Sequence, residues 1–133
     1  MAFHTYSFEK LEVYKSSRIF RVNIRKLLKN FPVEEKYDLV SQLKRAADSI
    51  GTNIAEGSGR SSNFDQAHFT NVAFSSAMEV IDHLNTSLDM NYISQEKYVE
   101  LRVELDKIAH MLNSLYKFQL GNKENTLKRN QNK

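Results

Sequence analysis

The chain contains no cysteine, which excludes disulfides, thiolate metal sites and cysteine nucleophiles and fits a reducing compartment. It has one proline and four glycines in 133 residues, so few positions favour a break in a helix. No apolar run approaches the roughly 18–20 residues of a membrane-spanning helix. The first residues also lack the basic and apolar blocks of a signal peptide. We therefore expect long helices, a cytoplasmic location and no membrane contact.

The length and composition are those of one globular domain. Hydrophobic residues make up 41% of the chain and charged residues 26%, which excludes wholesale disorder. We expect a folded body over residues 1–120, because 121–133 is polar and has too little apolar surface to fold alone.

The net charge of +3 is unevenly distributed, with all of the excess in residues 121–133. Residues 9–30 carry a net charge of +5, whereas residues 63–90 contain no Lys or Arg and carry −4. Two such segments in a small domain either attract each other or present separate charged faces to partners.

The apolar periodicity predicts four helices. The first begins at an N-cap on Ser7 and ends at the Phe31-Pro32 pair, and the second runs from Pro32 to about 57–60. Gly51 inside the second helix indicates close packing. The predicted apolar stripes of these helices comprise Val13, Phe20, Ile24, Leu27 and Phe31, then Leu39, Leu43, Ala46, Ile50 and Ile54.

The third helix is predicted from a cap at Ser62 to about Met90, and the fourth from a cap at Ser94 to Gly121. The breaks between helices are only a few residues long, which makes neighbours antiparallel. The fold class is therefore all-α, an antiparallel up-down-up-down four-helix bundle. Phe74, Met78 and Ile81 widen the apolar surface of the third helix, which suggests an oligomer interface.

A polar line borders the apolar face of the predicted second helix. Polar groups at a core margin need hydrogen-bond partners, so a network that sets helix register is one interpretation. A binding or catalytic groove and an ordinary solvated edge are the others. The line consists of Gln42, Arg45, Ser49, Asn53, Glu56 and Arg60.

The first helix carries a basic face, which is a candidate nucleic-acid interface because cations on a rigid rod can neutralise a row of phosphates. Tyr14 lies among these charges and is a candidate for stacking on a base. The alternative is a merely solvated face. The basic residues are Lys15, Arg18, Arg21, Arg25, Lys26 and Lys29.

Motifs for catalysis or cofactor binding are not found. The segments 79–83 and 106–110 have the wrong spacing for the Glu-x-x-His pairs of di-metal bundles. Arg60 and His68, like Arg102 and His110, are too far apart for the Arg–His motif of HEPN ribonucleases. No Gly-rich phosphate loop or nucleophile elbow occurs. We expect no catalytic residue, metal or cofactor.

Residues 31–60, FPVEEKYDLVSQLKRAADSIGTNIAEGSGR, resemble the signature of proteins encoded in intervening sequences of bacterial 23S ribosomal RNA genes. Upstream, Phe8, Leu11 and Val13 to Lys15 match the opening of that family, and the resemblance extends over about residues 8–118. It implies a four-helix bundle that assembles as a ring, with pentamers as the expected form, and no established enzymatic activity. A related bundle, the accessory variability determinant of diversity-generating retroelements, binds nucleic acid, which by analogy implies RNA or DNA association here.

The residues and the resemblance together predict a non-enzymatic homo-oligomer that associates with RNA or DNA through its basic first helix. The alternative is a protein–protein interaction scaffold that uses the apolar third helix and the polar line of the second.

Overall fold

A computed structural model describes residues 2–121, and over this range the chain is helical without strands. A short 3-10 turn, η1 (Ser7–Lys10), precedes α1 (Glu12–Leu28). A second 3-10 turn, η2 (Val33–Glu35), precedes α2 (Leu39–Ser58). Two longer helices follow, α3 (Asn63–Asp89) and α4 (Gln95–Gly121). The predicted tail at 121–133 lies, apart from Gly121, outside the described residues.

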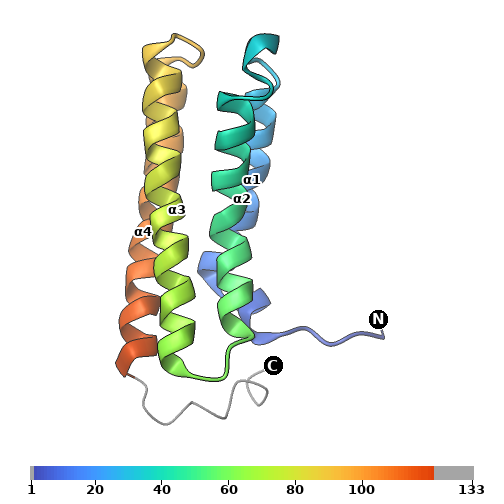
Figure 1. Cartoon of the computed structure of the whole chain (residues 1–133), viewed down its shortest axis with the longest axis vertical. Coiled ribbons are helices and arrows are strands. Elements are labelled where there is room, and N and C mark those ends of the chain that lie inside the picture. Colours follow the sequence, from blue (N-terminus) through green and yellow to red (C-terminus); the bar gives the residue numbers. More distant parts are fainter. Residues whose placement is uncertain (1, 122–133) are drawn as a thin grey trace.

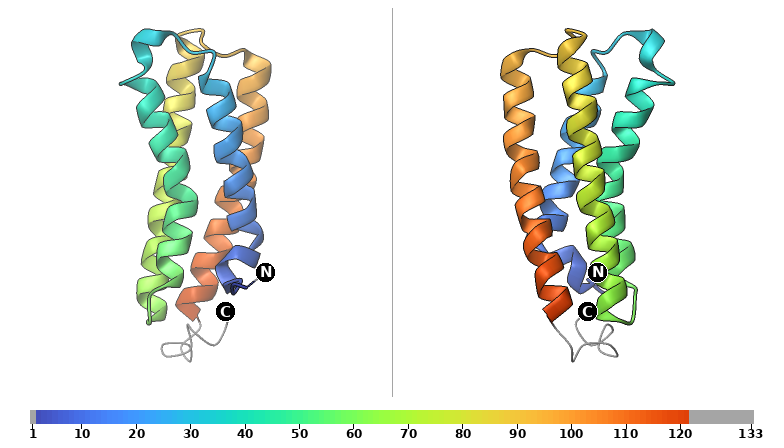
Figure 2. Two further views of the ribbon diagram at one scale, coloured as in Figure 1. Left: turned by 90° about the vertical axis from the view of Figure 1, so that its right-hand side faces the viewer. Right: turned by 60° about the vertical axis from the view of Figure 1, so that its left-hand side comes forward.

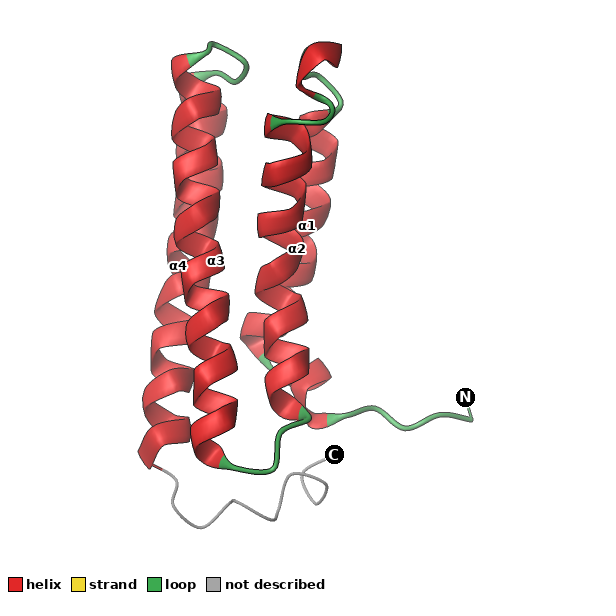
Figure 3. Ribbon diagram, viewed as in Figure 1, coloured by secondary structure: helices red, strands yellow, loops and turns green. Residues whose placement is uncertain are grey.

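The four helices form an antiparallel bundle, as predicted (Figure 1). The α1–α2 and α3–α4 connections lie at one end, and the α2–α3 connection lies at the other, with the start of the chain (Figure 3). Helices that are consecutive in the chain pack on each other, and α1 also packs on α4, which closes the bundle. The backbones of α1 and α3 lie across the diagonal and are not adjacent, and the α1–α4 seam is the most sparsely packed side.

The predicted apolar stripes of the first two helices lie in the core, with one exception. Leu28 is buried, whereas the predicted Leu27 is only partly so. Every predicted core residue of α2 is buried. The largest fully buried apolar side chains come from all four helices: Phe20, Ile24, Leu43, Ile50, Val80, Leu84, Leu105, Ile108 and Leu112.

The prediction of one first helix capped by Ser7 is wrong. The backbone is extended at Leu11 and separates η1 from α1, and Ser7 lies inside η1. In one continuous helix, Phe8 and Leu11 would fall on the solvent side, away from Phe20. The break instead packs both side chains against the core.

The start of the second helix is also later than predicted. Pro32 opens η2, and α2 begins at Leu39. The intervening residues close one end of the bundle, because Phe31 is buried and packs on Tyr92 at 5.3 Å between ring centroids. Tyr92 Oη also donates to Glu35 Oε2 at 2.7 Å, which joins the two connections at this end.

The predicted caps of the last two helices are confirmed. Ser62 Oγ accepts from the backbone N–H of Asp65, and Ser94 Oγ accepts from that of Lys97, both at 3.1 Å. The end of α3 adds a feature that was not predicted. Asn91 has a φ of 60°, and the N–H of Tyr92 donates to the carbonyl of Ser87 at 2.9 Å. This geometry is a Schellman motif with asparagine in the left-handed position.

Two glycines of α2 allow close approach of its neighbours. An added Cβ would lie 2.8 Å from Ser17 Oγ at Gly51, and 2.9 Å from Phe69 Cβ at Gly57. The close packing inferred from Gly51 is therefore present against α1, and Gly57 provides the equivalent contact with α3. Within residues 2–121, no helix is long and apolar enough to cross a membrane.

Candidate nucleic-acid interface

The outer face of α1 presents four exposed basic side chains along one side of the rod: Lys15, Arg18, Lys26 and Lys29. Among residues 2–121, none of them has a carboxylate within ion-pair distance. Fourteen residue steps separate the first from the last, or about 21 Å along the helix axis. Figure 2 (left) shows α1 and α2 on the side of the bundle that faces the viewer. We call these four residues the α1 cation row.

Arg25 is different from the α1 cation row because it forms an ion pair within the chain. Its two terminal nitrogens contact both carboxylate oxygens of Asp48 on α2, the second pair at 2.6 Å. The hydrogen bond that Arg25 donates to Asp48 raises the pKa of the Arg25 guanidinium above its usual value. The expectation that Arg25 is available to phosphate therefore needs correction: Asp48 already neutralises it.

Arg21 is half-buried against α2. Its Nη1 lies 3.2 Å from the position that a Cβ on Gly51 would occupy. The missing side chain at Gly51 therefore makes room for Arg21 as well as Ser17. The six predicted basic residues thus divide into the four of the α1 cation row and two, Arg21 and Arg25, that lie against α2.

Tyr14, the residue predicted to stack on a base, packs against η1, which covers part of its ring. It is half-buried and makes an edge contact with Phe8, with ring centroids 4.9 Å apart. The side chains exposed among the cations are instead aliphatic: Ile19 is 61% exposed and Val22 48%.

The acidic face of the protein belongs to α3. Asp65, Glu79, Asp82 and Asp89 are all exposed there, and α3 is not adjacent to α1 in the bundle. The basic and acidic helices occupy opposite corners of the bundle, so their charges do not pair within the chain. His83, the buried histidine of α3, lies 3.1 Å from Glu79 on the same helix.

The middle of the polar line on α2 forms a hydrogen-bond network with α3. Ser49 Oγ lies 2.8 Å from Ser76 Oγ, and Ser76 Oγ also donates to the carbonyl of Val72. Asn53 Nδ2 donates to both the carbonyl and the Oγ of Ser49 at 2.8 Å. Because the hydroxyl pair requires one alignment of α2 and α3, this part of the line has the geometry of a register-setting network.

The rest of the polar line does not join that network. Gln42 donates to Asp38 one turn earlier, and Arg45 is exposed. Glu56 and Arg60 are 3.7 Å apart at the other end, where Arg60 also lies over the ring of Phe69 at 4.6 Å. The predicted line is therefore not one network: Ser49 and Asn53 form one pair, Glu56 and Arg60 form another, and Gln42 and Arg45 belong to neither.

A cleft of about 320 Å³ opens between α1 and α4 beside the α1 cation row. Its polar wall is an Asn23–Glu104 pair: Asn23 Nδ2 donates to Glu104 Oε1 at 3.1 Å and to Oε2 at 3.3 Å. Burial of Glu104 raises the pKa of its carboxyl. Among the described residues, no group of three or more His, Cys, Asp or Glu side chains has a metal-binding arrangement.

Sequence reasoning missed Asp48, Asn23 and Glu104. Equal distance from the α1–α2 connection does not predict the partner of Arg25, because Arg25 lies in the last turn of α1 whereas Asp48 lies more than two turns into α2. Asn23 and Glu104 lie on the first and last helices, and no single connection relates them.

Comparison with known proteins shows which family the chain belongs to. The sequence profile of 23S rRNA-intervening sequence proteins matches residues 9–114, which is most of the chain. The chain belongs to this family. The residues that match the family profile include those of the α1 cation row, the α2–α3 hydrogen-bond network and the α1–α4 cleft. It agrees with the resemblance found in residues 8–118.

A crystal structure of a protein of unknown function from the S23 ribosomal protein family of Bacteroides thetaiotaomicron VPI-5482 has a similar fold. The two chains are 30% identical with a TM-score of 0.73, and the similarity covers 79% of this chain and 95% of the other. No curated protein matches this chain.

Proposed function

We propose that this protein is a non-enzymatic, homo-oligomeric bundle that binds RNA or DNA through the α1 cation row. The observation that carries the proposal is a set of four exposed cations on one rigid helix, without carboxylate partners among residues 2–121. A helix holds such side chains at fixed spacing, so several phosphates can be neutralised at once.

The distribution of charge supports the proposal. The acidic residues of α3 lie at the opposite corner of the bundle, so a polyanion on α1 does not approach them. The contact would be dominated by phosphate, because the exposed side chains among the cations are aliphatic. Assembly into a ring, with a pentamer as the expected form, would bring several rows to one nucleic acid and increase avidity.

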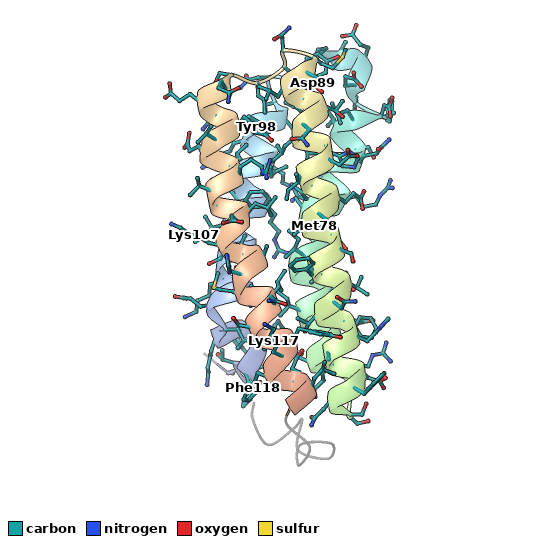
Figure 4. The ribbon with its side chains drawn as sticks, turned by 90° about the vertical axis from the view of Figure 1, so that its left-hand side faces the viewer. Met78, Asp89, Tyr98, Lys107, Lys117 and Phe118 are labelled. Carbon is teal, nitrogen blue, oxygen red and sulfur yellow. The ribbon has the colours of Figure 1, made fainter. Side chains whose placement is uncertain are left out.

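The test is a salt titration of binding to a labelled RNA hairpin, measured by fluorescence anisotropy. Four phosphate contacts on a duplex predict a slope of about −3.6 in log K against log salt for each engaged row. Arg18→Gln should weaken binding and reduce the slope by about one. Lys107→Gln is the matched control, because it removes an exposed cation from the outer side of α4, away from the bundle (Figure 4).

Asp48→Asn provides a test in the opposite direction. It leaves Arg25 in place and removes its carboxylate partner, so a fifth cation becomes available to phosphate. Binding should strengthen, with a slope steeper by about one. The proposal is wrong if no binding occurs at low salt, or if Lys107→Gln weakens binding as much as Arg18→Gln.

The α3–α4 surface favours a second candidate, a protein–protein scaffold. A groove of about 310 Å³ there is lined by half-buried Phe74 and by Met78, which is 39% exposed. A defined protein partner that binds the wild type but not Met78→Glu, from a preparation whose 260/280 nm absorbance excludes nucleic acid, would favour this candidate.

A further inference from the structure

The α1–α4 cleft is continuous with the α1 cation row. Asn23 and Lys26 line the cleft and also the surface groove of α1 that holds Lys15 and Arg18. A strand whose phosphates contact the row therefore runs past the mouth of the cleft. The cleft volume of about 320 Å³ is at the lower end of small-ligand sites, which begin near 300 Å³.

The walls of the cleft suit a flat, neutral group. Leu27 and Leu101 contribute apolar surface, one from each helix. Lys97 and Glu100, which also line it, neutralise each other at 3.3 Å. Lys26 and Glu104, the other two charged residues of the lining, have opposite signs, so the cleft carries no net charge. A planar heterocycle suits apolar walls without net charge better than a phosphate or an ammonium ion does.

Polar atoms with spare hydrogen-bonding capacity line the same space. Among residues 2–121, only Asn23 Nδ2 donates to the Glu104 carboxylate, whereas an ionised carboxylate has about four acceptor positions. The side chain of Asn30 makes no hydrogen bond within residues 2–121, so its amide can both donate and accept. Carboxylates accept from the exocyclic amino group of a base, and asparagine pairs with base edges.

We propose that the α1–α4 cleft binds one unpaired, amino-bearing nucleobase (adenine, cytosine or guanine) of the strand whose phosphates lie on the α1 cation row. This inference rests on the proposed function and deepens it, since the row supplies affinity and the cleft supplies selectivity. Glu104 accepts from the base amino group and Asn30 contacts the base edge. Uracil and thymine lack the amino group and leave Glu104 without this hydrogen bond.

The experiment compares three RNA hairpins of equal length: fully paired, with one bulged adenosine, and with one bulged uridine. Wild-type protein should bind the adenosine bulge about tenfold more tightly than the other two, the size of one good base contact. Asn30→Phe, at an exposed position, should fill the cleft and abolish this preference without altering the salt slope.

Ser114→Phe is the matched control. Ser114 is also exposed and lines a different groove, of about 390 Å³, along the same seam. The Ser114→Phe variant should retain the preference for the adenosine bulge. Circular dichroism should show that both variants are folded. As a direct readout, cytidine 5′-monophosphate should shift the Asn23 and Asn30 side-chain amide signals in ¹⁵N spectra more than uridine 5′-monophosphate does.

The outcomes separate this inference from the proposed function. Equal binding of all three hairpins with a steep salt dependence would overturn the base-binding cleft and leave the phosphate interface standing. Loss of the preference in Ser114→Phe would also overturn it. Absence of binding to any hairpin at low salt would overturn both.

Discussion

Glu104 illustrates at the scale of a single residue how packing alters chemistry. It lies on a loosely packed seam, half-buried, with Asn23 as its hydrogen-bond donor. Burial disfavours the charged carboxylate and is the main cause of its raised pKa. A carboxyl whose pKa is higher in the folded protein than in the unfolded chain contributes most to stability at pH values below its pKa in the unfolded chain. That contribution is lost as the pH rises through its pKa in the folded protein.

Glu104→Gln should therefore stabilise the protein at neutral pH but not in acid. Glutamine keeps an oxygen that accepts from Asn23 and removes the charge. We expect the melting temperature to rise by about 1–3 °C at neutral pH, a fraction of a kcal/mol for a chain of this length. At a pH below the pKa of glutamate in the unfolded chain, the difference in melting temperature between the variant and the wild type should disappear. Scanning calorimetry at the two pH values measures this.

Asp106→Asn is the control for that comparison, since Asp106 is an exposed carboxyl on the same helix. It should leave the melting temperature nearly unchanged at both pH values. A larger gain for Glu104→Gln in acid than at neutral pH would contradict the assignment.

At the scale of the element, α2 depends on glycine for its contacts. A Cβ at Gly57 would lie 2.9 Å from Phe69 Cβ and 3.3 Å from the backbone carbonyl of Gln66, neither of which moves easily. Gly57→Ala should destabilise the protein by about 1–3 kcal/mol through overpacking, despite the better helix propensity of alanine. Urea unfolding followed by circular dichroism measures the change.

Gly59→Ala is the matched control at the end of the same helix. Its φ of −82° suits any residue, and an added Cβ comes no closer than 3.4 Å to the Glu56 carbonyl. The change in unfolding free energy should stay below about 1 kcal/mol. Equal destabilisation by both variants would show that close packing at Gly57 is not the cause.

The elements also show how far the sequence was informative. Ser62 and Ser94 were predicted as caps because a cap depends on residues three positions apart, and both are confirmed. The break at Leu11 was missed because it depends on the core that Phe8 and Leu11 reach after the chain turns. Capping depends on residues close together in the sequence, whereas the break at Leu11 depends on packing with core side chains that are distant in the sequence.

At the scale of the whole molecule, the bundle has distinct sides. The α1 cation row lies at one corner and the acidic face of α3 at the opposite corner. The α3–α4 groove, with Met78 on α3 (Figure 4), is separate from the α1 cation row and its cleft. An assembly through α3 and α4 would therefore leave the row and the cleft accessible.

We predict that the protein forms a homo-oligomer through this α3–α4 surface. Light scattering should give a multiple of the 15.5 kDa chain mass. Met78→Glu should reduce that mass, because it places a charge in a partly buried apolar surface. Val33→Glu, at a valine that is 84% exposed, should have no effect. A single-chain mass for the wild type would contradict the prediction.

The sequence by itself determined the four helices, most of their apolar stripes, two of their caps and the location of charge along the chain. These features depend on residues within a few turns of one another. Only the tertiary structure decided that Arg25 is paired with Asp48, that Tyr14 packs on Phe8, and that Asn23 meets Glu104 in a cleft. The physical reason is that periodicity specifies which side of a helix is buried, whereas the packing of separate helices specifies which polar groups meet.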